Sequence, residues 1–139
     1  MPRAPTKTLS LGKKTAALKA RLDAFPGAAA SPMNASRGTV PLVLIYKVMS
    51  KTFAILSVRE EEFVMLKADP HFVPMLREKY EGIGHRTHLD PRHWIAVALA
   101  SDVPAKDVAR LAKQSYELTV AGLTRKQKEQ LAAMQDDAT

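Results

Sequence analysis

The sequence predicts an α+β domain in which an antiparallel sheet has its helices packed on one face. Four runs of β-branched and aromatic residues have the length of strands, and the first three follow one another closely. Segments with apolar residues at helical spacing precede, interrupt and follow these runs. Strands joined by short turns pair in antiparallel fashion, so the helices form a separate layer. The chain has 139 residues, enough for one domain with one hydrophobic core.

The segment before the sheet is expected to hold an arm, a helix and a loop. Residues 1–9 mix Pro, Thr and Lys with little to bury, which predicts a flexible basic arm. A helix is expected over residues 10–24, with Ser10 as its N-cap and Pro26 as its stop. Residues 26–41 are rich in Ala, Ser, Pro and Gly and are expected to form a long loop.

The first two expected strands form a hairpin whose turn is Met49-Ser50-Lys51. A third run follows directly, and a fourth comes after a loop over residues 81–92. The expected strands are residues 42–48, 52–58, 63–68 and 94–99.

Three further helices are expected from their start signals. Asp69-Pro70 opens the second helix, although Pro74 would move its start one turn later. Pro104 opens the longest helix, which Gly122 ends. Thr124 and Gln127 form a capping-box pattern that opens the last one. The predicted organisation is an arm over residues 1–9, a domain over residues 10–123, and a C-terminal helix and tail over residues 124–139.

Composition excludes several classes of protein. The chain has no cysteine, which excludes disulfides, thiolate nucleophiles and cysteine-ligated metals. The longest apolar run, residues 40–46, contains Pro41 and is too short to span a membrane. No signal-peptide pattern is visible, so we expect a cytoplasmic protein without membrane contact, and a monomer.

The net charge of +7 is concentrated at the start of the chain. The first 21 residues hold six basic residues and no acidic one, whereas the rest holds 15 basic and 14 acidic residues. The basic start is therefore a candidate contact for a polyanion, although a solvated arm or an organellar transit peptide has the same composition.

Residues 85–94 concentrate three of the four histidines, the single tryptophan and two arginines. The spacing of His85, His88 and His93 around Asp90 matches no strong metal signature, so we expect no metal there. We expect His88 or His93 to be buried and hydrogen-bonded, with Trp94 in or near the core. An exposed Trp94 or His85 would instead be able to stack on a base.

No catalytic constellation is visible in the sequence. Ser115-Tyr116 falls on the longest helix without a glycine elbow or an obvious general base, so Ser115 is expected to allow close helix–sheet packing and Tyr116 to cap the sheet edge. Gly82-Ile83-Gly84 is too short for a dinucleotide or phosphate-loop fingerprint. We therefore expect a protein that is not an enzyme and needs no cofactor.

Five segments together resemble the MmcQ/YjbR family, in order and spacing. The resemblance covers about residues 14–126 and is carried by residues 47–54, 66–70, 76–78, 88–97 and 115–119.

This resemblance implies a CyaY-like α+β fold, similar in shape to frataxin, and DNA binding through a double wing of β-hairpins. Two departures lie at the proposed contact surface. Met49-Ser50 stands where the family usually has glycine, and Gly84–His88 stands where it usually has a Pro-x-Tyr-His run. Iron binding does not carry over, because hard oxygen ligands are needed and the first helix is basic.

Lys47 and Lys51 flank the expected hairpin turn, where their ammonium groups would reach phosphates without reading sequence. The alternative is that they keep an exposed hairpin soluble and block edge pairing. A rival function is a small-molecule or partner-protein binding module with a pocket near His88 and Trp94. Four further cations would extend the phosphate-binding surface if they share its face: Lys67, Arg77, Arg86 and Arg92.

Deleting residues 1–12 tests the basic arm, because it removes Arg3 and Lys7. If both contact phosphates, the slope of log affinity for DNA against log salt should become shallower by up to about two units. The measurement is a salt titration of DNA binding with both proteins. An unchanged slope would show that the arm makes no phosphate contact.

Overall fold

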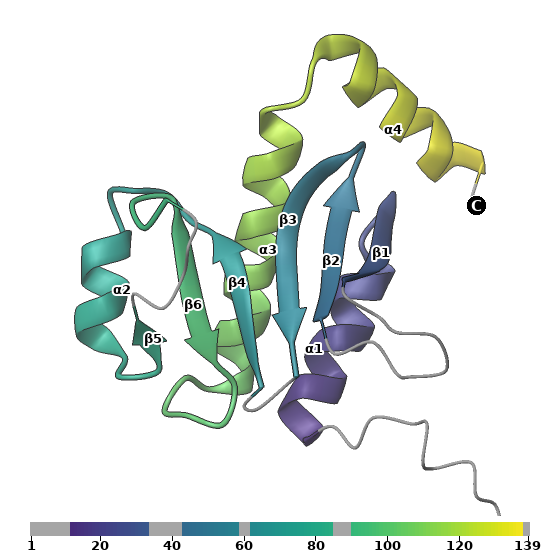
Figure 1. Ribbon diagram of the computed structural model, residues 1–139. Coiled ribbons are helices and arrows are strands. Elements are labelled where there is room, and N and C mark those ends of the chain that lie inside the picture. Colours follow the sequence, from purple (N-terminus) through teal and green to yellow (C-terminus); the bar gives the residue numbers. More distant parts are fainter. Residues whose placement is uncertain (1–11, 34–42, 59–61, 85–89, 138–139) are drawn as a thin grey trace, which may run out of the picture.

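The computed structural model describes residues 12–33, 43–58, 62–84 and 90–137. These residues form a six-stranded sheet in the order β1-β2-β3-β4-β6-β5, and every neighbouring pair is antiparallel (Figure 1). The strands are β1 (Ala28–Met33), β2 (Val43–Val48), β3 (Lys51–Ser57), β4 (Phe63–Lys67), β5 (Ile83–Gly84) and β6 (Trp94–Ala98).

Four helices complete the described fold: α1 (Lys13–Ala24), α2 (Val73–Lys79), α3 (Ala105–Ala121) and α4 (Arg125–Asp137). The first and third pack together on one face of the sheet, α2 lies beside the β5–β6 edge, and α4 crosses the end of the β2–β3 hairpin (Figure 1). The predicted α+β fold class is therefore confirmed. No helix among the described residues is long and apolar enough to cross a membrane.

Two strands fall where loops were predicted. Residues 28–33 form the edge strand β1, although Ala-Ala-Ala-Ser-Pro-Met has low strand propensity. Pairing with β2 supplies the stabilisation that the sequence lacks, and an edge position tolerates Pro32. The two-residue strand β5 lies within the predicted 81–92 loop, where Ile83 pairs with Val97.

The starts of the helices also differ in part from prediction. The N-cap of α1 is Gly12, whereas Ser10 and the predicted arm lie outside the described residues. The second helix begins at Val73, because Pro74 fits only in a first turn, where no backbone N–H is needed. The capping box before α4 is confirmed, since Thr124 and Gln127 exchange backbone-to-side-chain hydrogen bonds of 3.1 Å.

The β2–β3 turn consists of two residues rather than the predicted three. Met49 and Ser50 both have positive φ, 49° and 68°, as a two-residue hairpin with a type I′ twist requires. Lys51 already belongs to β3 and pairs with Val48. This conformation favours glycine, which the MmcQ/YjbR family usually has here.

A bulge follows this turn and inserts Phe53 into β3. Lys47 pairs with Thr52, but Tyr46 pairs with Ala54, so Phe53 has no partner in the ladder. Its ring is fully buried beside the ring of Tyr116, at 5.4 Å between centroids.

Ser115 closes the gap that the bulge leaves between β3 and β4. Their ladder ends at the Ala54–Leu66 pair, which leaves the carbonyl of Phe53 and the amide of Lys67 without partners in the ladder. The buried Ser115 hydroxyl donates to that carbonyl and accepts from that amide, at 2.8 Å. One side chain of α3 thus ties both central strands together.

Tyr116 ties α3 to the start of the edge strand. Its ring stacks on Phe25 at 4.7 Å, and its hydroxyl donates to the carbonyl of Pro26. Burial raises the pKa of this hydroxyl. Ser115 and Tyr116 therefore hold the sheet to α3 at two places.

Changing Ser115 to Ala should lower the free energy of unfolding by about 2–3 kcal/mol, because it leaves the part-buried amide of Lys67 and the buried carbonyl of Phe53 without this partner. Urea denaturation measures this change. Lys113→Ala, at an exposed position of the same helix, is the control and should stay within about 0.5 kcal/mol of the parent. Equal stability of Ser115→Ala and the parent would show that the hydroxyl is not needed.

Candidate nucleic-acid interface

The sheet brings three predicted residues to one of its ends. Lys47 lies near the end of β2, Lys67 is the last residue of β4, and Trp94 is the first residue of β6. Because neighbouring strands run in opposite directions, these positions meet at the end of the sheet that is uppermost in Figure 1. We call Lys47, Lys67 and Trp94 the sheet-end cluster.

All three side chains leave the same face of the sheet. Lys67 pairs with Trp94, and its neighbour Leu66 is fully buried in the core on the helix side. Lys47 follows Tyr46, whose hydroxyl donates to Asp23 of α1 at 2.8 Å. Strand alternation therefore places the sheet-end cluster on the face turned away from α1 and α3.

The two lysines of this cluster are not neutralised within the described part of the chain. Lys47 is exposed and Lys67 half-buried, and neither side chain forms an ion pair or a hydrogen bond there. One strand separates them, so their backbones lie about 10 Å apart. Partly exposed apolar residues continue along the same face: Ile45, Ile55 and Phe63.

Lys51 is exposed at the same end but leaves the other face of the hairpin. It pairs with Val48, which is fully buried among core residues, whereas Lys47 pairs with Thr52 in the adjacent position. Neighbouring positions in a ladder point to opposite faces. The two lysines predicted to act as a pair therefore share the hairpin tip but not a surface.

Arg77 is engaged in internal hydrogen bonds. Its Nη2 donates to the carbonyls of Pro91 at 2.7 Å and Trp94 at 3.3 Å, and its Nε is buried without a partner among the described residues. The side chain fixes the turn before β6 against α2. Arg77 and Arg92 also line a cleft of about 400 Å³ whose walls are Pro70, Val73, Pro74 and Pro91.

Asp90 organises the turn that precedes β6. Its carboxylate accepts from the backbone amide of Arg92 at 2.9 Å and contacts Nδ1 of His93 at 3.0 Å. The Arg92 backbone amide, followed by the His93 and Arg92 side chains, lowers the pKa of Asp90 to about 2. The Arg92 side chain is 80% exposed and pairs weakly with Asp90, at 3.4 Å.

His88 or His93 was expected to be buried and hydrogen-bonded, and of this pair the structure describes only His93, whose side chain is 47% exposed and contacts Asp90. Trp94 is half-buried at the end of the sheet. His85, Arg86 and His88 lie outside the described residues. No group of three His, Asp or Glu side chains that would hold a metal occurs among the residues described.

Most carboxylates of the described body serve structural contacts. The carboxylate of Asp69 accepts a hydrogen bond from the backbone amide of His71 at 2.9 Å, and that of Asp90 accepts one from the backbone amide of Arg92. Backbone amides of Glu81 and Gly82 lower the pKa of Asp102, and the Tyr80 hydroxyl lowers that of Asp107. The two of these carboxylates that lie nearest in sequence to Lys67 and Trp94, Asp69 and Asp90, are therefore already bound. Two others are similarly engaged: Asp23 with Lys19 and Tyr46, and Glu62 with Gly12 and Thr15.

The family model for YjbR matches residues 23–118. The chain belongs to the YjbR family. The match spans the whole sheet but excludes most of α1 and all of α4, so it is narrower than the resemblance predicted over residues 14–126. No curated protein matches the chain.

Solved structures of proteins from Deinococcus radiodurans and Pseudomonas syringae share this architecture. The crystal structure of DR2400 from Deinococcus radiodurans, described as having a DUF419 domain, is 25% identical, with a TM-score of 0.72 over 94% of this chain and 92% of that one. A protein from Pseudomonas syringae, also 25% identical, gives TM-scores of 0.53 for its crystal structure and 0.51 for its solution structure. Those two comparisons cover 65% of this YjbR chain and 86% and 81% of the other chains.

Sequence reasoning missed Asp90 as the residue that shapes this turn. The signal was present, because Asp-Pro-Arg is a typical turn sequence in which the Asp side chain accepts from the amide two residues on. It also missed the shared end of β2, β4 and β6, which follows from the strand order and is not visible along the chain.

The lowered pKa of Asp90 leads to a prediction about pH. In the folded protein the pKa of the Asp90 carboxyl is about 2, below the value of about 3.9 for an unfolded chain. Because the pKa is lower in the folded state, the Asp90 carboxylate stabilises the turn fully above about pH 4, and this stabilisation is lost as the pH falls toward 2. The carboxyl resonance of Asp90, followed by NMR, should titrate near pH 2 and shift upward in His93→Ala. A midpoint near 4 in the parent would mean that these hydrogen bonds do not form in solution.

Proposed function

We propose that this YjbR protein binds DNA without catalysis, by phosphate contacts from Lys47 and Lys67 beside Trp94. The observation that carries the proposal is the sheet-end cluster itself: two cations without partners among the described residues and a half-buried tryptophan on one face. The nearby carboxylates Asp69 and Asp90 are held by backbone amides, so they compete less for the lysines.

The spacing of the cluster suits a phosphate backbone. The lysine backbones lie about 10 Å apart, and each DNA strand carries a phosphate every 3.4 Å or so along the helix axis. Two flexible ammonium groups would thus reach phosphates about three nucleotides apart. Such contacts give affinity without sequence preference, and Trp94 would add stacking where a strand is unpaired.

The basic start of the chain adds to this surface in the proposal. Six cations before the first acid, Asp23, would supply long-range attraction that falls steeply with salt. We propose a monomer acting in the cytoplasm.

A small-molecule or partner-protein binding module is the second candidate. The cleft of about 400 Å³ beside Arg77 and Arg92 favours it, because proline walls and a buried, unpartnered Nε would suit an apolar anion. Trp94 is not part of its lining. We prefer DNA binding because the lysines of the sheet-end cluster form no hydrogen bond or ion pair with any described residue, whereas the Nη2 of Arg77 is bound to two carbonyls.

Lys47→Ala/Lys67→Ala tests the DNA proposal directly. We expect the salt slope of duplex binding, measured by fluorescence anisotropy, to become shallower by about two units, because each phosphate contact contributes about 0.9. The loss should be equal for unrelated DNA sequences. DNA should also change the fluorescence of Trp94, the single tryptophan.

Lys113→Ala/Lys128→Ala is the matched control, since it removes the same charge from exposed positions on α3 and α4. It should bind DNA almost as the parent does. Lys47→Ala/Lys51→Ala should lose less than Lys47→Ala/Lys67→Ala, because Lys51 leaves the other face. If Lys47→Ala/Lys67→Ala folds and binds DNA like the parent, the DNA proposal is wrong. Binding of a small molecule or partner protein in the cleft beside Arg77 then becomes the preferred function.

A further inference from the structure

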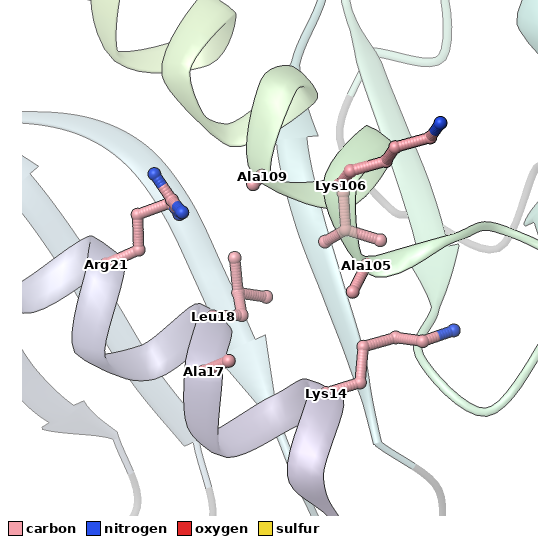
Figure 2. Close-up of a pocket in the computed structure, with 8 residues that line it drawn as sticks. Lys14, Ala17, Leu18, Arg21, Ala105, Lys106 and Ala109 are labelled. Carbon is pink, nitrogen blue, oxygen red and sulfur yellow. The ribbon is translucent and has the colours of Figure 1, made fainter.

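A second cationic site lies on the opposite side of the sheet, in the groove between α1 and α3. The groove encloses about 160 Å³, and three of its lining residues are basic: Lys14, Arg21 and Lys106. In Figure 2 the side chains of Arg21 and Leu18 rise from α1 toward α3, while Lys14 and Lys106 stand at the other end of the groove. No lining residue is acidic.

The ammonium group of Lys14 is held in place by carbonyl oxygens, and the carboxylate of Asp102 lies within electrostatic reach of it. Its Nζ donates to the carbonyl of Val103 at 2.7 Å and to that of Ser101 at 3.4 Å. Carbonyl oxygens satisfy the ammonium hydrogens without supplying a negative charge, and an ammonium group has three hydrogens to donate. One end of the groove therefore carries a positioned cation whose hydrogen bonds go to neutral oxygens.

Arg21 and Lys106 are exposed and form no ion pair or hydrogen bond within the described part of the chain. The acids nearest to them in sequence are engaged elsewhere. Asp23 binds Lys19 and Tyr46, and the carboxylate of Asp107 accepts from Tyr80 and pairs with Arg110. The three groove cations thus line one space to which no acidic residue contributes, although Asp102 and Asp107 act electrostatically on Lys14 and Lys106 from outside its lining.

The small side chains of α1 and α3 leave this space unfilled. Ala17 and Ala109 face it where larger apolar residues would have closed the helix contact. Lys14 and Arg21 are seven residues apart on α1, about 10 Å along the axis. A single phosphate group cannot contact both ends, whereas a chain of linked phosphates can.

We propose that the groove between α1 and α3 binds a ligand with linked phosphates, held by Lys14 and Lys106 at one end and Arg21 at the other. A nucleic-acid strand and a small polyphosphate share this chemistry. The site lies on the other face of the sheet from the sheet-end cluster and does not depend on the proposed DNA contacts there.

Isothermal titration calorimetry of the full chain with inorganic tripolyphosphate at low salt tests the groove. We expect saturable binding of one ligand per chain, weaker by about five- to tenfold in Arg21→Ala/Lys106→Ala. Both positions are exposed, so this variant should fold, as circular dichroism would verify. Orthophosphate should bind more weakly than tripolyphosphate, because it cannot span the groove.

Lys47→Ala/Lys67→Ala is the matched control, since it removes the same charge from the other face. It should bind tripolyphosphate as the parent does. Absence of saturable binding, equal affinity for orthophosphate, or an equal loss in both double variants would overturn the proposal, the last by showing that only net charge matters.

Labelled single-stranded and duplex DNA identify the source of the phosphates. If Arg21→Ala/Lys106→Ala loses both DNA and tripolyphosphate, the groove receives a nucleic-acid strand. If it loses tripolyphosphate alone, the groove receives a small polyphosphate. Both results support the groove, and the proposed function is judged separately by the effect of Lys47→Ala/Lys67→Ala on DNA binding.

Discussion

The hydroxyl of Ser115 is the interaction on which the centre of this fold depends. The bulge at Phe53 ends the β3–β4 ladder early, and a helix side chain takes the place of the missing strand pair. This fixes α3 against the sheet and sets the last residue of β4 in extended backbone. The same contact holds the backbone amide of Lys67, whose side chain leaves the other face of the sheet.

Acidic and basic side chains have different roles in this protein. Carboxylates mostly hold turns and helix ends, as Asp90 and Asp102 do through backbone amides. Among the described basic side chains, Arg77 and Lys14 bind carbonyls and four others pair with carboxylates, whereas Lys47, Lys67, Arg21 and Lys106 have no such contact there. A modest excess of basic residues therefore produces a larger excess of uncommitted positive charge on the surface. This division supports both proposed phosphate sites.

Local sequence predicted the elements whose own residues favour them. The β-branched runs gave β2, β3, β4 and β6, and the Thr124–Gln127 pair gave the start of α4. The edge strand β1 could not be predicted, because only pairing with β2 makes Ala-Ala-Ala-Ser-Pro-Met extended. The sequence also could not show that Lys47 and Lys51 leave opposite faces of the hairpin, because this depends on a two-residue turn formed by Met49 and Ser50. The sheet-end cluster needed the strand order, which is a property of the whole sheet.

Gly27 lies where two elements from opposite ends of the described chain, β1 and α4, pack together. It has a φ of 74°, and a Cβ there would lie 2.4 Å from Cδ1 of Leu131 in α4. The edge strand starts at the next residue, so the entry to β1 and the seat of α4 are one packing unit, although about 100 residues separate them. We expect this corner to form late in folding, because its contact joins residues about 100 positions apart and closing so long a loop costs conformational entropy. The central strands and α3 can assemble before it, and the two terminal elements then dock together.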